Sequence, residues 1–167
     1  MKLLIHDLDK ETFISLFPEI DNNTKQISNN GNIHSCIGCF GCWIKTPGEC
    51  VIKDGYDRGG EEFGKCNELI IISKCTYGGF SPFVKNVLDR NISYIHPYFI
   101  IHNGQMHNKR RYNNIITLKV YFYGDSISDR EKATAQKLVA ANADNYDGIV
   151  GKVVFMDSVY KLGGVAL

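Results

Sequence analysis

The chain lacks any long hydrophobic run. Its first apolar run stops at Ile5, which is too short for the hydrophobic region of a signal peptide. No stretch approaches the roughly 18 apolar residues of a membrane-spanning helix. We therefore expect a cytoplasmic protein with no membrane partner. In that reducing compartment, closely spaced cysteines favour metal, cluster or redox chemistry over a disulfide scaffold.

An excess of one charge sign is also missing. The 19 lysines and arginines nearly balance the 18 aspartates and glutamates, and the formal net charge is +1. This balance argues against nucleic acid as the main partner. The stretch 90–112 is locally basic and aromatic, and we interpret it as a solvated loop or an oligomer contact. The 98–114 connection is longer than a usual helix-to-strand loop, which indicates a functional or interface role.

Repeats, low-complexity tracts and linkers are absent as well. A chain of 167 residues can form one sizeable core but not comfortably two. We therefore predict a single domain over residues 1–167. Short apolar runs typical of strands cover residues 2–6, 24–28, 67–73, 115–124 and 152–156.

Helical patterns separate these runs. Asp9 is placed to cap the first helix, and Ser81 and Pro82 open the helix after the third strand. Ser128 and Glu131 have capping-box spacing. This alternation predicts an α/β fold, specifically a flavodoxin-like doubly wound five-stranded parallel sheet with helices on both faces. Ligands of such folds bind at the carboxyl ends of the strands.

Four of the six cysteines lie in one short stretch, "CIGCFGCWIKTPGEC". Three cysteines at this spacing recur in ferredoxin-type cluster loops, and glycine turns let successive thiolates point at one centre. A [4Fe–4S] site, zinc, and free or redox-active thiols all stay open, as does a simple glycine-rich turn. The four candidate ligands are Cys36, Cys39, Cys42 and Cys50.

The sequence "CIGCFGCWIKTPGECVIKDG", followed by an apolar strand and "YGGFSPFVKNVLDR", resembles the NADPH-dependent FMN reductases of the flavodoxin-like superfamily. The most similar branch is the one related to iron–sulfur flavoproteins and multimeric flavodoxins, and the match runs from about Ile33 to Arg90. The resemblance implies an FMN site, NAD(P)H as reductant, and homo-dimers or tetramers. In the iron–sulfur branch it also implies a [4Fe–4S] cluster on the four cysteines.

The family's flavin-contacting loop corresponds to residues 74–80. We expect the Tyr123–Ser126 loop, with Tyr123 and Gly124 as cofactor contacts, to form a second wall. Small residues let the backbone approach a flavin, and Tyr77 or Phe80 can pack against its ring. We expect the cysteine loop on this same edge of the sheet. By itself, however, the stretch also fits a Gly-Gly turn before a capped helix. The flavin-contacting candidates in the loop are Cys75, Thr76, Tyr77, Gly78, Gly79 and Phe80.

The loop after the first strand departs from the family pattern. Family members carry a glycine-containing phosphate loop there, whereas this chain has "IHDLDKETF". Asp7 and Asp9 stand where the FMN phosphate belongs, and they would repel it by roughly 1 kcal/mol or less if solvated and by several if buried. The pattern therefore predicts that the usual phosphate pocket is missing. FMN would then bind weakly, in another pose, with help from a partner subunit, or not at all.

The same stretch faintly resembles the Asp-x-Asp-x-Thr motif of haloacid-dehalogenase-type phosphatases, with Asp7 as nucleophile and Asp9 as general acid. The later chain lacks convincing companion residues, so we interpret Asp9 as a helix cap and Asp7 as solvated. The five histidines show no metal-ligand spacing and fit surface positions. No general acid or base can be named from the sequence.

The function expected from these features is that of an FMN-dependent NAD(P)H oxidoreductase-like electron-transfer flavoprotein with an atypical or missing phosphate-binding loop. Its partners would be a small-molecule or protein electron acceptor and further copies of itself. The alternative is a flavin-free, degenerate family member that acts as a binding or assembly module or carries a metal or cluster on its cysteines.

Overall fold

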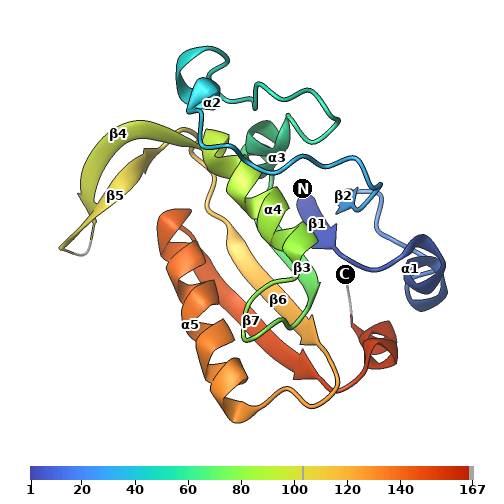
Figure 1. The fold of residues 1–167 in the computed structure, drawn as a ribbon. Coiled ribbons are helices and arrows are strands. Elements are labelled where there is room, and N and C mark those ends of the chain that lie inside the picture. Colours follow the sequence, from blue (N-terminus) through green and yellow to red (C-terminus); the bar gives the residue numbers. More distant parts are fainter. Residues whose placement is uncertain (103, 166–167) are drawn as a thin grey trace.

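The computed structural model describes residues 1–102 and 104–165. Its main sheet has five parallel strands in the order β2-β1-β3-β6-β7 (Figure 1). A flavodoxin-like sheet has this order, and the predicted fold class is therefore confirmed. The strands are β1 (Lys2–His6), β2 (Thr24–Ser28), β3 (Glu68–Lys74), β6 (Thr117–Tyr123) and β7 (Ile149–Met156).

The helices begin where the sequence places their caps. The Asp9 carboxylate accepts the Thr12 N–H, Ser81 accepts the Val84 N–H, and Ser128 forms a full capping box with Glu131. The α-helices are α1 (Lys10–Leu16), α2 (Gly41–Ile44), α3 (Gly59–Lys65), α4 (Pro82–Arg90) and α5 (Asp129–Asn145). Two 3₁₀ helices, η1 (Asn91–Tyr94) and η2 (Val159–Gly164), complete the helical elements of the described chain.

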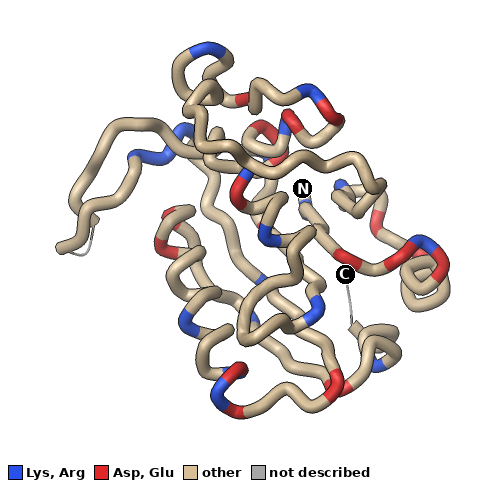
Figure 2. Tube along the Cα trace, viewed as in Figure 1, with Lys and Arg blue, Asp and Glu red and all other residues tan. Residues whose placement is uncertain are grey.

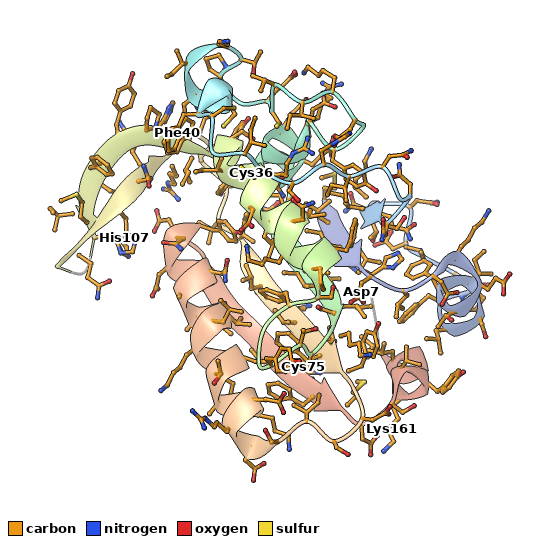
Figure 3. The ribbon with its side chains drawn as sticks, viewed as in Figure 1. Asp7, Cys36, Phe40, Cys75, His107 and Lys161 are labelled. Carbon is orange, nitrogen blue, oxygen red and sulfur yellow. The ribbon has the colours of Figure 1, made fainter. Side chains whose placement is uncertain are left out.

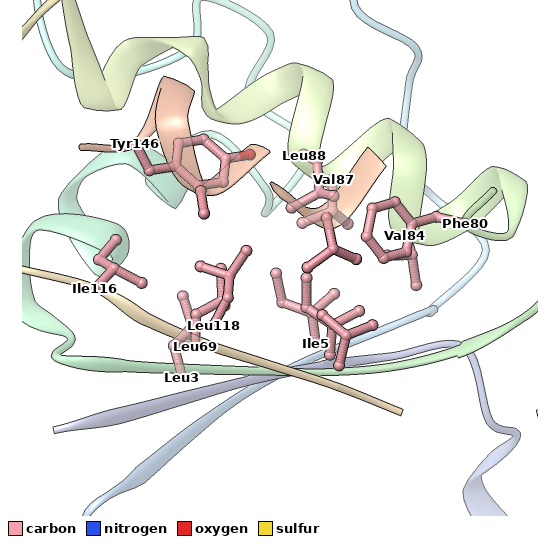
Figure 4. Packing of buried hydrophobic residues seen from close by; sticks show 14 of the residues in the cluster. Leu3, Ile5, Leu69, Phe80, Val84, Val87, Leu88, Ile116, Leu118 and Tyr146 are labelled. Carbon is pink, nitrogen blue, oxygen red and sulfur yellow. The ribbon is translucent and has the colours of Figure 1, made fainter. Parts of the chain in front are cut away.

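Side chains that alternate along the strands form two hydrophobic layers. Leu3 and Ile5 face α3, α4 and α5 together with alternate residues of β3 and β6 (Figure 4). Leu4 faces the opposite way, toward Phe13 of α1 and Leu162 of η2. The sheet is thus covered on both faces, and among the described residues the second face is covered by one short helix, α1, and the 3₁₀ helix η2. In the described part of the chain, no helix is long and apolar enough to cross a bilayer.

The connection before β6 is not the loop that we expected. Two antiparallel strands, β4 (Ile95–His102) and β5 (Gln105–Arg110), form a hairpin that projects away from the main sheet (Figure 1). Gly104 has a φ of 76° in the turn, a conformation that glycine adopts without steric cost. The β-branched and aromatic residues of β4 favour a strand.

Candidate functional site

The carboxyl edge of the sheet is organised around Asp7, which directly follows β1. Its Oδ2 accepts the backbone N–H of Lys74 at 2.8 Å, and its Oδ1 accepts the hydroxyl of Tyr123 at 3.0 Å. The expectation that Asp7 is simply solvated is therefore wrong, because its carboxylate joins the ends of β1, β3 and β6. Burial and the nearby Asp7 charge both raise the pKa of Tyr123, so its phenol stays a neutral donor.

A phosphate does not fit at the end of β1. Leu8 is buried there, and Asp9 accepts both the N–H and the hydroxyl of Thr12, each at 2.8 Å. The two carboxylates thus occupy the donors that an anion would need. The geometry agrees with the prediction of a missing phosphate pocket. It also places Asp9 as a helix cap, as the sequence indicated, and not as a free acid group.

The predicted flavin bed is a closed turn packed on α5. Thr76 and Gly79 exchange two backbone hydrogen bonds, of 2.9 and 2.8 Å. Gly78 has a φ of 79°, and a Cβ on it would lie 2.8 Å from Thr134 Cβ. The glycine is therefore required by the close approach of α5, whether or not a ligand is bound. Tyr77, with a φ of 52°, is 91% exposed at the tip of the turn.

Phe80 and Cys75 are less accessible to a flavin than the sequence predicts. Phe80 is buried in the core and stacks on Phe122 with ring centroids 5.3 Å apart, so the expectation that its ring packs against a flavin is not supported. Cys75 donates its N–H to Tyr123 O at 2.8 Å, and partial burial raises the pKa of its thiol. Of the two predicted aromatic contacts, Tyr77 alone presents an open ring.

A cavity of about 720 Å³ lies beside this turn, at the ends of β6 and β7. Gly124 and Ser126 line it, so the segment predicted as the second wall does border an open space. Ser126 has a φ of 63°, an uncommon conformation for a residue other than glycine. Lys132 of α5 and Lys161 of η2 bring positive charge to the cavity, and Asp157, which is paired with Lys161, brings one negative charge. Figure 3 shows Lys161 on the same side of the molecule as Asp7 and Cys75.

Sequence reasoning missed the two lysines of this cavity. Each is paired with a nearby carboxylate, Lys132 with Asp129 at 3.2 Å and Lys161 with Asp157 at 2.8 Å. Both pairs are solvent-exposed, and such pairs are weak enough to exchange partners with an anionic ligand. A sequence signal was present, since both residues belong to segments that directly follow strands on the ligand-binding edge.

The four motif cysteines line one small, mostly apolar cavity of about 40 Å³. Cys42 and Cys50 are buried, whereas Cys36 and Cys39 are exposed. Burial and the neighbouring Cys50 raise the pKa of Cys42, so the Cys42 thiol stays neutral. Among the described residues, no group of three or more histidine, cysteine or acidic side chains is placed to hold a metal ion. The four cysteines therefore line the same cavity, but they are not arranged as the ligands of a metal ion or cluster.

Arg90 fixes the wall of this cysteine pocket. Its guanidinium binds Asp54 at 2.6 Å and 2.9 Å and donates to the carbonyls of His34 and Ile52. The Arg90 side chain is 1% exposed, and it lines the cysteine pocket together with Cys50. Burial would raise the pKa of Asp54, but the hydrogen bonds from Arg90, His34 and Tyr56 hold it well below its usual range. The carboxylate is therefore charged at neutral pH.

The cysteine pocket and the glycine turn lie at opposite ends of α4. Ser81 caps the helix beside the turn, whereas Arg90 and Ile92 at its other end line the pocket. A helix of nine residues is roughly 13 Å long, and Figure 3 shows Cys36 and Cys75 well apart. The expectation that the cysteine loop borders the flavin edge is wrong, because the chain after β2 runs back along α4.

No protein-family model matches the chain, and no curated protein sequence matches it. Several solved structures do match over nearly the whole chain. An azoreductase from Bacillus anthracis str. Sterne is 12% identical, with 94% of this chain and 87% of that chain covered and a TM-score of 0.55. The azoreductase AzrA is 11% identical, with 96% of this chain and 88% of that chain covered and a TM-score of 0.55.

A third structure is an FMN-dependent NADH-azoreductase from Bacillus anthracis str. Ames Ancestor in complex with FMN. It is 14% identical, covers 97% of this chain and 93% of that chain, and has a TM-score of 0.56. At these identities the similarity establishes the flavodoxin-like fold of the chain and nothing finer.

Proposed function

We propose that the protein is a flavin-dependent NAD(P)H oxidoreductase. The observation that carries this proposal is the similarity of almost the whole chain to azoreductases, one of which was solved with FMN. The carboxyl edge supports it, because an exposed aromatic ring, a glycine turn and a large cavity lie together there. The flavin itself supplies the hydride and electron chemistry, and the chain supplies binding and orientation.

The described residues favour one placement of the flavin. Tyr77 offers its ring at the tip of the turn, and Gly124 and Ser126 offer backbone next to the cavity. Lys132 and Lys161 are the cations that line this cavity and could hold a phosphate, which would have to displace Asp157 from Lys161. The end of β1 is occupied by Asp7 and Asp9. A flavin phosphate would then be held by Lys132 and Lys161, on the β7 side of the sheet.

Flavin titration tests the proposal. We expect purified protein to bind FMN, to quench its fluorescence and to reduce it with NADH or NADPH. Tyr77→Ala should weaken both FMN and riboflavin, whereas Lys132→Ala should weaken FMN alone. Tyr98→Ala, an exposed tyrosine on the hairpin, is the matched control. A protein that binds neither flavin and oxidises neither nicotinamide would refute the proposal.

A second candidate function rests on the cysteine pocket. The four cysteines from the motif line one cavity, and the cationic Arg90 would offset the charge of thiolates that hold a metal or cluster. Binding would have to draw in the exposed Cys36 and Cys39. Iron, sulfide and zinc content of protein purified without oxygen tests this idea. Cys39→Ala should lower the metal content, whereas Cys75→Ala, outside the pocket, should not. Equal metal content in both variants would eliminate these ligands.

A further inference from the structure

A cavity of about 320 Å³ lies along the β2 edge of the main sheet. Four consecutive residues of β2, from Lys25 to Ser28, line it. Alternate side chains of a strand point to opposite faces, so a run of consecutive lining residues places the cavity at the edge of β2 and not on one face. The loop before α3, α3 itself and the end of α4 form the other walls. Among the described residues, none lines both this cavity and the one at the ends of β6 and β7.

The backbone of Gln26 points to this edge. β2 is the outermost strand, so within the described chain one of its edges pairs with β1 and the other has no strand beside it. Lys2 donates its N–H to the carbonyl of Asn23 at 3.0 Å and is in register with Thr24. Since successive backbone groups of a strand point in opposite directions, the odd-numbered residues of β2 bond to β1 and Gln26 directs its N–H and C=O outward. The cavity therefore borders one free donor and one free acceptor.

Two buried side chains bring unused hydrogen-bond donors to the same cavity. Arg90 and Asn91 both line it, and each is only 2% exposed. Within the part of the chain that the structure describes, Arg90 Nε and Asn91 Nδ2 have no hydrogen-bond partner. The Asn91 amide is held in place by Gly59, where a Cβ would lie 1.7 Å from its Oδ1. Because buried polar groups are nearly always paired, these two donors indicate a bound group with acceptor oxygens.

The cavity also has two opposite charges without ion-pair partners. Its charged lining residues are Lys25, Arg58, Glu62 and Arg90. Arg58 is paired with Glu61, and Arg90 with Asp54. Lys25 of β2 and Glu62 of α3 form no ion pair with any residue that the structure describes. Figure 2 shows a basic position on β2 and acidic positions on α3. One cation and one carboxylate thus remain available to a ligand.

We propose that this cavity binds a free α-amino acid. Its carboxylate accepts hydrogen bonds from the buried donors and from the Gln26 N–H, and it pairs with Lys25. Its ammonium group pairs with Glu62 and donates to the Gln26 carbonyl. A zwitterion matches the balanced charges of Lys25 and Glu62, whereas an anion or a cation would leave one of them unpaired. The inference goes beyond the proposed redox function and does not depend on it.

The rest of the lining favours an amino acid with an apolar side chain. Ile27 and Val87 line the cavity and pack on the hydrophobic core, and the Tyr56 ring contacts Phe83 edge-on. The cavity volume is at the lower end of the range for small-molecule pockets, about 300–1,000 Å³. A single amino acid is a ligand of this size. L-Leucine is therefore a suitable probe.

Isothermal titration calorimetry of the full chain with L-leucine, L-leucinamide and N-acetyl-L-leucine tests the proposal. The amide lacks the carboxylate and the N-acetyl derivative lacks the ammonium group, so each removes one half of the recognition. We expect L-leucine to bind about tenfold more tightly than either derivative, because each derivative loses a hydrogen-bonded charge. A protein that does not bind L-leucine would overturn the proposal. Equal binding of L-leucine and N-acetyl-L-leucine would overturn it too, since the site would then recognise carboxylates in general.

Three variants locate the binding site. Asn91→Leu removes a buried donor, and Lys25→Gln and Glu62→Gln each remove one charge, so each should weaken L-leucine binding about tenfold. Asn91→Leu should unfold at a temperature similar to that of the wild type, because the amide donor that it removes has no partner within the described chain. Lys137→Gln, at an exposed position on α5, is the matched control and should bind L-leucine like the wild type. Wild-type affinity in both Lys25→Gln and Glu62→Gln would refute the assignment of the site.

Discussion

The hydroxyl of Tyr123 donates a hydrogen bond to the carboxylate of Asp7 at 3.0 Å, across the carboxyl ends of β1 and β6. The same carboxylate accepts the Lys74 N–H from β3, which lies between these two strands. One side chain therefore closes the site at which a flavodoxin-like sheet would otherwise receive an anion. This arrangement leads to a prediction about ligand choice.

Asp7→Asn should leave the preference for FMN over riboflavin unchanged. The substitution removes a negative charge but keeps an oxygen that accepts the Lys74 N–H. The proposed phosphate position beside β7 is three strand spacings from β1, or about 14 Å, and exposed charges this far apart are largely screened. Fluorescence titration measures both ligands, and Lys132→Ala, which should weaken FMN alone, is the control. A preference for FMN that rises several-fold in Asp7→Asn would place the phosphate at the end of β1 and contradict the prediction.

Arg90→Ala should be strongly destabilising. The substitution would leave the buried Asp54 carboxylate without its cationic partner, and the carbonyls of His34 and Ile52 would lose their hydrogen bonds from Arg90. Breaking one partner of a buried ion pair costs about 3–5 kcal/mol. Urea unfolding measures this loss. Lys85→Ala is the matched control, because Lys85 forms an exposed pair with Asp89 and should cost under about 1 kcal/mol. Equal losses in the two variants would show that the buried pair is not special.

His6 should make the fold sensitive to mild acid. Its ring is buried against Phe13, and burial lowers its pKa from 6.5 to about 4, although the Leu8 backbone partly offsets this. The folded state thus prefers neutral histidine. The stability that this preference contributes is complete above pH about 6.5 and is lost as the pH falls toward about 4, by about 3 kcal/mol in total.

His6→Phe should remove that part of the pH dependence, whatever its effect on stability at neutral pH. Unfolding free energies measured at several pH values between these limits give the slope for each protein. His34→Phe, at an exposed position, should retain the wild-type slope. If the His6 variant and the wild type lose stability in parallel, the buried imidazole does not titrate as described.

Gly78→Ala should disturb the turn at residues 75–80 more than a simple backbone penalty explains. Its Cβ would meet Thr134 Cβ at 2.8 Å and Glu131 O at 2.9 Å. Gly31→Ala separates the two effects, since Gly31 has a similar φ of 82° but open space around its Cβ position. We expect Gly31→Ala to cost about 1 kcal/mol and Gly78→Ala clearly more, measured by thermal unfolding. Equal losses of stability in the two variants would mean that α5 shifts to accommodate the added Cβ without a measurable free-energy cost.

Local signals in the sequence predict the frame of the molecule well. The apolar run of β3 and the caps at Asp9, Ser81 and Ser128 lie where the sequence places them. These features depend on side chains within a few residues of one another. The hairpin was harder to predict, because Pro97 interrupts its strand pattern.

The candidate sites depend on contacts that sequence spacing does not encode. Arg90 binds Asp54 across 36 residues, and this bond draws the cysteine loop to the far end of α4. Likewise, His6 is buried and not on the surface as expected, because Phe13 of α1 stacks on its ring at 4.1 Å. In both cases tertiary packing placed a polar residue that local patterning assigns to the surface.

Trp43 is the single tryptophan of the chain, and its position makes it a natural optical probe. Its indole stacks on Phe40 at 5.2 Å and is bonded to the backbone that leads into β4. Intrinsic emission should therefore respond to changes in the cysteine loop or the hairpin, and only weakly to a ligand at Tyr77. In one unlabelled sample, visible absorbance of a bound flavin would report on the Tyr77 end of α4, and Trp43 emission would report on the cysteine end.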